Sequence, residues 1–203
     1  MQSLIDGLAM KAVRDGGEKL ALTAERLSLL GSAYKRKALI SKKDRLTTLD
    51  KMGRRYKKAF KLKRSKKQFD WYPLLNWVAA ELAASWQDEQ SRKSFEAGKE
   101  KFQVWIGRAK QGLEADLAVQ KEFWKEVMRV DAELLESLVD DSLDESTIES
   151  IAGKYLEASK RGSPREFESV VDQLDFLLEM ASSQAPIADA LAKLRSKLTP
   201  GRG

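Results

Sequence analysis

The densest group of side chains able to do acid–base or metal chemistry lies between residues 140 and 145. Asp140 and Asp141 are followed closely by Asp144 and Glu145. A calcium loop would require a glycine at its sixth position and a glutamate at its twelfth, and both are absent here. Because carboxylates next to a helix N-terminus also stabilise the helix, we interpret this group as the end of one helix and the start of the next.

The composition removes most other reaction chemistries. The 203 residues include no cysteine and no histidine, which excludes disulfides, thiol nucleophiles, Cys–His and Ser–His relays, and histidine-ligated metals. The pair Gly16-Gly17 is not followed by Gly-Lys-Ser/Thr, so it is interpreted as a helix break and not as a phosphate loop. We therefore expect no catalytic residue, no metal site, no cofactor and no enzyme activity. A small carboxylate-dependent enzyme is a third class, behind two classes of binding protein.

Charge is divided between two segments of the chain. Residues 35–67 hold 16 lysines and arginines against 2 acidic residues, a balance of +14, whereas residues 114–179 hold 18 acidic residues against 7 basic ones, a balance of −11. Such asymmetry concerns partners and not the fold. The basic segment is open to three interpretations: attraction to the acidic segment in the same chain or in another copy, docking of an acidic protein, and binding of nucleic acid or an anionic membrane surface. Tyr34, Tyr56 and Phe60 lie at core-like helical spacing, which argues against stacking on bases.

The elements that must position these charges are helices. Apolar residues recur at helical spacing along the whole chain, and no alternating run is long enough for a strand. No apolar run approaches the ~18 residues needed to span a bilayer. The N-terminal apolar stretch contains Asp6 and has no basic region before it, which is unlike a secretory signal. We therefore expect no membrane span and a cytoplasmic location. About nine helices are predicted: 1–12, 18–40, 44–63, 73–86, 89–111, one or two within 115–142, 147–160, 163–181 and 186–198, with a tail at 199–203.

Local sequence signals mark several helix ends. Two S-x-x-E patterns, Ser146 to Glu149 and Ser163 to Glu166, predict capping boxes, and the helices on either side of Gly162 are predicted to form a tight hairpin. Since the residue before a proline avoids the helical conformation, Trp71 and Tyr72 are expected to be extended and outside the helix that Pro73 begins. An aromatic side chain at that place suits the rim of a binding groove, although packing in the core is the favoured alternative.

The helices also show a degenerate repeat. The tetratricopeptide signature W-x2-L-G-x2-Y on a first helix is matched by Leu27-x2-Leu30-Gly31-x2-Tyr34, with leucine in place of tryptophan. The same spacing recurs in residues 75–82 and 148–155, and each match is followed by a candidate second helix. Three matches in order favour a helix-hairpin solenoid, whereas an irregular helical bundle is the alternative. Both are all-α.

The residues around these matches resemble a known family. Leu29-Leu30-Gly31-Ser-Ala-Tyr34-Lys35-Arg36, Tyr56-Lys-Lys-Ala59-Phe60 and Phe69-Asp70-Trp71-Tyr72-Pro73-Leu-Leu-Asn76 are similar to the tetratricopeptide-like "TRAFs-binding" region first named in MAP-kinase-kinase-kinases. The resemblance covers roughly residues 25–85. It implies a protein-interaction region of the kind that accompanies caspase-like (CHAT) or other effector domains in bacterial multidomain proteins.

Together these observations predict an all-α, tetratricopeptide-like solenoid with a C-terminal helical extension. The expected organisation is degenerate repeats at 1–113, an acidic helical extension with a third weak helix pair at 114–198, and the tail. The predicted function is a non-catalytic protein–protein interaction module, an adaptor or regulatory scaffold, that belongs to or binds a larger bacterial signalling or effector protein. An acidic protein or peptide segment, or the acidic half of another copy, would bind outward-facing residues, which are Lys35, Arg54, Arg55 and Lys58 with Trp71 at the rim. The alternative is a nucleic-acid-binding helical protein that uses residues 35–67.

Overall fold

The computed structural model describes residues 23–65 and 69–199, and every regular element in these two ranges is an α-helix. In chain order the helices are α2 (Ala24–Ile40), α3 (Arg45–Ser65), α4 (Trp71–Ser85), α5 (Glu89–Val119), α6 (Phe123–Val139), α7 (Glu145–Ser159), α8 (Pro164–Met180) and α9 (Ala185–Leu198). The predicted all-α class is confirmed. The predicted helix at 1–12, the Gly16-Gly17 break, Lys66, Lys67 and the last residues of the tail lie outside the described residues.

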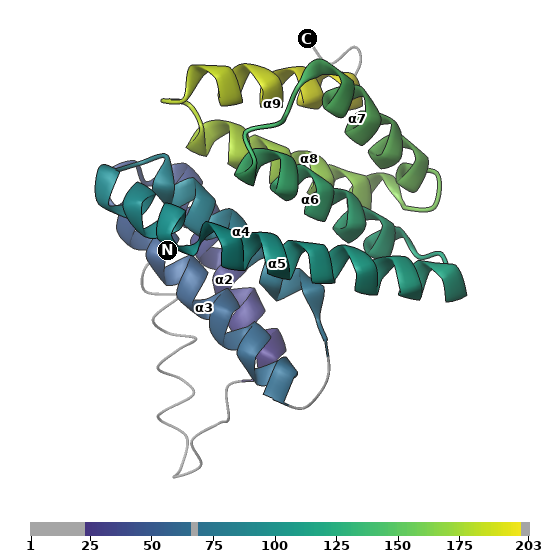
Figure 1. Cartoon of the computed structure of the whole chain (residues 1–203), viewed down its shortest axis with the longest axis horizontal. Helices are drawn as coiled ribbons and strands as arrows, with labels where there is room; N and C mark the ends of the chain where they lie inside the picture. The colour runs from purple at the N-terminus through teal and green to yellow at the C-terminus, as the bar shows by residue number, and fades with distance from the viewer. Residues whose placement is uncertain (1–22, 66–68, 200–203) are drawn as a thin grey trace.

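Successive helices pack as hairpins into a short superhelix. The pairs are α2/α3, α4/α5, α6/α7 and α8/α9. Each of the first three pairs also packs on the following pair: α3 contacts α4, α5 contacts α6, and α7 contacts α9. In Figure 1, α2 to α5 form one part of the molecule and α6 to α9 stack beside it, with α5 running along the boundary. One hydrophobic core continues from α2 to α9, so the hairpins bury their apolar faces against their neighbours, as repeat proteins do.

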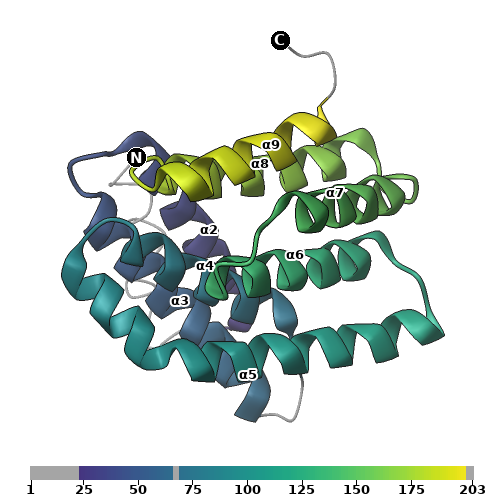
Figure 2. The ribbon, with the colours of Figure 1, turned by 45° about the horizontal axis from the view of Figure 1, so that its top comes forward.

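The superhelix curves far enough for the last hairpin to reach the first. Helix α8 packs against α2 and α4 as well as α9, and Figure 2 shows α8 and α9 lying above α2. Arg45 at the start of α3 forms an ion pair with Glu179 at the end of α8, at 2.6 Å. Gln87 Nε2 donates a hydrogen bond of 2.8 Å to the carbonyl of Met180. These contacts join residues more than ninety positions apart and fix how the two halves face one another.

Gly31 explains why the signature of the first hairpin has a glycine. A Cβ atom placed on Gly31 would lie 2.6 Å from the ring of Tyr56 on α3, and that ring is completely buried. Helices α2 and α3 therefore approach more closely than any residue with a side chain at position 31 would allow without displacement. Leu27 and Tyr34 of the signature are also buried, and Leu30 is half-buried against the core, so the signature positions of this helix have packing roles.

The second half pairs its helices differently from the prediction. The tight hairpin expected between 147–160 and the following helix is wrong: α7 packs against α6 and α9, whereas α8 packs against α9, α2 and α4. The reason lies in the buried face of α7, where the Tyr155 hydroxyl donates a 2.6 Å hydrogen bond to Asp131 on α6. The match at 148–155 therefore lies on the second helix of the third pair and not on a first helix.

Helix α5 is longer than predicted. It continues from Glu89 to Val119, past the expected end at 111, and residues 120–122 separate it from α6. The interval 115–142 is thus shared by two helices. The division between domains at 113 and 114 stays a prediction, and both residues lie inside α5, which packs on both α4 and α6.

The structure corrects two predicted helix starts. Trp71 and Tyr72 belong to the first turn of α4, because the Asp70 side chain accepts a 3.3 Å hydrogen bond from the Tyr72 N–H and caps the helix two residues earlier than expected. Pro73 is tolerated there, since the first four N–H groups of a helix have no partner within the helix. Helix α7 is capped by Asp144, which accepts from the Thr147 N–H at 2.8 Å, and not by Ser146. A carboxylate is the stronger acceptor and also suits the positive end of the helix dipole.

The second predicted capping box is confirmed. The Ser163 hydroxyl accepts from the Glu166 N–H at 3.3 Å, and the Glu166 carboxylate accepts from the Ser163 N–H at 2.8 Å. Pro164 follows at the first helical position. This start fixes the direction of α8, which forms one wall of the groove described next.

Candidate partner-binding surfaces

A groove of about 520 Å³ lies between the first helices of all four hairpins. Helix α2 contributes four residues, α4 two, α6 four and α8 five. The lining residues are Ser32, Lys35, Arg36, Leu39, Tyr72, Asn76, Trp124, Val127, Met128, Asp131, Ser169, Val170, Asp172, Gln173 and Asp175. No second helix of a pair takes part in this lining, so the groove is the inner face of the superhelix.

The α2 wall of the groove is basic. Lys35 donates a hydrogen bond to the Gln173 side chain on α8, and its amino group lies 5.2 Å from the centre of the buried Phe176 ring. Burial of the amino group lowers the Lys35 pKa to about 8, although Asp131 and Asp172 oppose the shift. Arg36 is exposed beside it. The structure therefore places Lys35 inside the groove and not on the outward-facing surface where the sequence predicted it.

The opposite wall, from α6 and α8, is acidic. Burial raises the pKa of Asp131 to about 6, and the hydrogen bond from Tyr155 and the charge of Lys35 hold that rise back. Asp172 is exposed, and Asp175 is ion-paired with Arg195 of α9 at 2.8 Å. The groove thus has cations along α2 and carboxylates along the helices that face α2.

Two exposed aromatic rings accompany these charges. Trp124 on α6 is 45% exposed and Tyr72 on α4 is 42% exposed. The Tyr72 hydroxyl lies within hydrogen-bond distance of Ser32 and Tyr56, which holds its ring at the edge of the first hairpin. Asn76 donates to the carbonyl of Tyr72 one turn earlier. The sequence indicated Tyr72 as an aromatic residue at the rim of a groove. It did not indicate Trp124 as a groove residue, because Trp124 reaches the groove through a helix far along the chain.

The other predicted partner residues lie elsewhere. Arg54 and Lys58 are exposed on α3 and Arg55 is half-buried, and none of the three lines the groove. Arg54 forms an ion pair of 2.9 Å with Asp50 on its own helix. Trp71 is only 9% exposed, and a Cβ atom on Gly112 of α5 would lie 2.6 Å from its ring. Trp71 therefore packs in the core, which was the favoured alternative. A role in partner binding for Arg54, Arg55, Lys58 and Trp71 stays a prediction.

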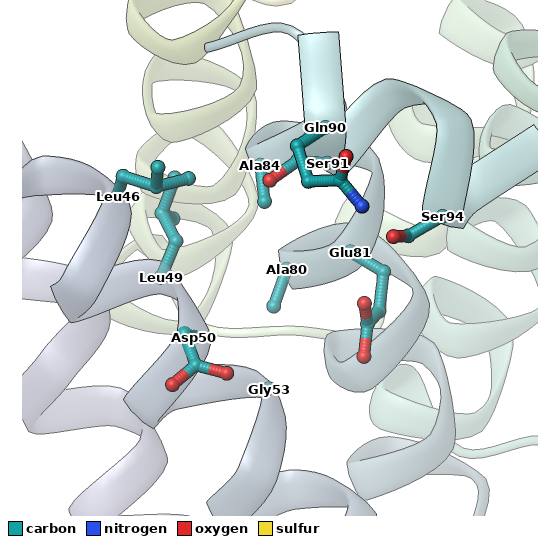
Figure 3. Close-up of a pocket in the computed structure, with 10 residues that line it drawn as sticks. All are labelled: Leu46, Leu49, Asp50, Gly53, Ala80, Glu81, Ala84, Gln90, Ser91 and Ser94. Atoms are coloured by element: carbon teal, nitrogen blue, oxygen red, sulfur yellow. The ribbon is translucent and has the colours of Figure 1, made fainter. Parts of the chain in front are cut away.

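A second, smaller cavity of about 300 Å³ lies between α3, α4 and the start of α5. Figure 3 shows Leu46, Leu49, Asp50 and Gly53 on one side and Gln90, Ser91 and Ser94 on the other, across Ala80 and Ala84. Its two carboxylates already have partners, since Asp50 pairs with Arg54 and Glu81 accepts from the Trp77 indole N–H at 2.7 Å. We assign it no ligand.

The acidic residues between 140 and 145 have structural roles, as the sequence predicted. Asp140 accepts from Gln103 at 2.6 Å, Asp144 caps α7, and Glu145 pairs with Lys193 at 3.2 Å. Asp141 has a positive φ of 52° in the turn between α6 and α7. Within residues 23–65 and 69–199 no three acidic side chains come together in a way that would hold a metal ion. In the same ranges no helix is both long and apolar enough to cross a membrane.

Comparison with known proteins gives one family. Residues 5–81 match the family described as Tetratricopeptide Repeats-Sensor, which is less than half of the chain. No curated protein and no solved structure matches. The matched range includes the signature Leu27 to Tyr34 and the close contact of Gly31 with Tyr56. The first part of the chain is therefore a tetratricopeptide-like region, in agreement with the repeat predicted from the sequence.

Proposed function

We propose that the protein is a non-catalytic protein–protein interaction module, an adaptor or regulatory scaffold, whose groove receives a segment of a partner protein. The observation that carries this proposal is that α2, α4, α6 and α8 all turn one side toward a single groove. Helical-repeat proteins use such inner surfaces for extended partners. A tetratricopeptide-like region at residues 5–81 supports the same class of function.

The charges of the groove define the chemistry of the partner. A carboxylate of the partner would contact Lys35 and Arg36. The acidic partner predicted from the sequence is therefore compatible with this wall of the groove. A polar or cationic group would face Asp172 on the opposite wall, and apolar side chains would contact Trp124 and Met128 on the α6 part of that wall. A segment of mixed charge thus fits the groove better than a uniformly acidic one, because like charges placed opposite each other are unfavourable.

The finer predictions concern context. Bacterial origin, a link to a larger effector protein and the "TRAFs-binding" identification rest on the resemblance described above, whereas the proposed cytoplasmic location rests on the sequence criteria for membrane spans and secretory signals. The outer residues Arg54, Arg55 and Lys58 belong to the same set of proposals. Charge reversal of Arg54 and Arg55 is expected to weaken binding of an acidic partner and to reduce its salt dependence, and unchanged binding would remove these residues from the surface.

The proposed groove can be tested without a known partner. Peptides of about a dozen residues are selected from a random library on the wild-type chain, and the best peptide is measured by calorimetry against single variants. Lys35→Met and Trp124→Ala should each weaken binding about tenfold or more, which corresponds to the loss of one central contact. Lys51→Met and Leu156→Ala are matched controls, since both residues are exposed and neither lines the groove. Equal binding by all four variants would show that the peptide binds outside the groove.

A further inference from the structure

A second surface, formed by α3 and α5, gathers cations around two tryptophans. The Arg64 and Arg108 guanidinium groups lie 5.1 and 5.0 Å from the centre of the Trp105 ring. The amino groups of Lys57 and Lys101 lie 4.8 and 5.6 Å from the ring of Trp77, which is buried on α4 beneath them. Lys61 is exposed on the same side of α3. We call this surface the cationic face and define it by five cations, Lys57, Lys61, Arg64, Lys101 and Arg108.

The charge of this face is not neutralised by the acidic half of the chain. None of its five cations forms an ion pair with any residue of 23–65 or 69–199. The acidic residues of the second half pair largely with basic residues of the same half. Glu149 pairs with Lys197, and Glu133 pairs with Arg129 and Lys154. Attraction between the basic and acidic halves within one chain therefore does not account for this face.

The geometry of the cations favours a phosphate backbone. A guanidinium group that lies over a ring can still direct N–H donors at its edge toward oxygen atoms. Because cations already lie over Trp105 and Trp77, these rings are not free to stack on the bases of a single strand. A double helix presents phosphates on its outside and needs no such stacking.

The lack of apolar surface argues against a protein occupant. Between residues 57 and 64 and between 101 and 108, Val104 is the one large apolar side chain that is well exposed. Protein interfaces have an apolar centre from which charged residues are depleted, whereas protein–nucleic acid interfaces are more polar and much more positively charged. We therefore propose that the cationic face binds the phosphate backbone of double-stranded nucleic acid, independently of its sequence. Its residues do not line the groove, so this site is separate from the one proposed for a protein partner.

Salt dependence gives a quantitative test. If all five cations contact phosphates, log K should fall with log salt concentration with a slope of about −4.5, or about 500-fold between 50 and 200 mM salt. The 203-residue chain is titrated into fluorescent DNA and RNA duplexes of about 20 base pairs, with anisotropy as the signal. The double variant Lys61→Gln, Arg64→Gln should reduce the slope to about −2.7, or about 40-fold over the same range. Comparison of the two duplexes tells which nucleic acid supplies the backbone.

Two further variants distinguish an effect of the cationic face from an effect of lower net charge or of altered folding. Lys121→Gln, Arg165→Gln removes the same charge from two exposed residues that lack an ion pair in the described part of the chain, and it should keep the wild-type slope. Lys61→Arg, Arg64→Lys keeps both charges and should keep the slope as well. The proposal is overturned if neither duplex binds at 50 mM salt, or if the two glutamine variants give the same slope. Tighter binding of a polyglutamate peptide than of either duplex would also overturn it and would assign the face to an acidic protein.

Discussion

Replacement of Gly31 by alanine tests the close packing of the first hairpin. The new Cβ would lie 2.6 Å from Cε2 of Tyr56, whereas carbon atoms in contact are normally about 3.5–4.0 Å apart. The ring must therefore withdraw by about 1 Å. Tyr56 has no exposed surface, and its hydroxyl is within 2.9 Å of the Ser32 hydroxyl, so the ring is enclosed and its hydroxyl end is held in place.

The expected magnitude follows from two opposing effects. Overpacking of a tight core costs about 1–3 kcal/mol, and we expect the upper part of this range because the ring is enclosed. Alanine in place of glycine stabilises a helix interior by about 1 kcal/mol. Gly31→Ala should thus lower the free energy of unfolding by about 1–2 kcal/mol.

Gly107 on α5 is the matched control. It also lies inside a helix, but a Cβ atom there would have nothing within 4 Å. Gly107→Ala should therefore raise the free energy of unfolding by up to about 1 kcal/mol. Urea denaturation followed by circular dichroism, with unchanged m-values, measures both variants. If Gly31→Ala is as stable as Gly107→Ala, the close approach of α2 and α3 is refuted.

Three further predictions concern charges and caps. Burial lowers the Lys35 pKa from 10.5 to about 8, so the unfolded chain binds more protons between these pH values and the wild type should gain stability as pH rises. Lys35→Met should remove this gain and raise stability at pH 7, by about 3 kcal/mol at most, and an identical pH profile for both proteins in denaturation experiments would contradict it. Ser163→Ala should cost about 1 kcal/mol in the same assay, whereas Ser146→Ala, which removes no cap, should change stability by only a few tenths; equal effects would contradict the assigned caps. Glu179→Ala leaves the buried Arg45 guanidinium unpaired and should destabilise more than Arg45→Met, which removes the charge and keeps the volume; the opposite order of melting temperatures would contradict the proposed link between α3 and α8.

Local signals predicted much of the helical framework. The spacing of Leu27, Gly31 and Tyr34 predicted the first hairpin correctly, because each position has a packing role that depends on nearby residues. The Ser163 box predicted the start of α8 for the same reason. The errors arose where two local signals compete. Asp144 displaced Ser146 as the cap of α7, since it lies two residues earlier and carries a full charge.

The groove could not be predicted because distant segments form it. Lys35 and Gln173 are 138 residues apart, and their contact depends on how far the superhelix curves. The basic pattern of residues 35–67 therefore gave no means to separate Lys35, which faces α8, from Arg54 and Lys58, which face solvent. The cationic face has the same origin, since Lys101 and Arg108 lie outside the basic segment and reach it only through the packing of α5 beside α4.

The most direct test of the proposed function is to locate the bound peptide on the protein. Amide chemical shifts are measured by NMR with and without the peptide selected on the wild-type chain. We predict that the changes concentrate at the groove residues of α2, α4, α6 and α8, with the largest near Lys35 and Trp124. Changes confined to α3 and α5, or to α7 and α9, would contradict the claim that the inner face of the superhelix receives the partner.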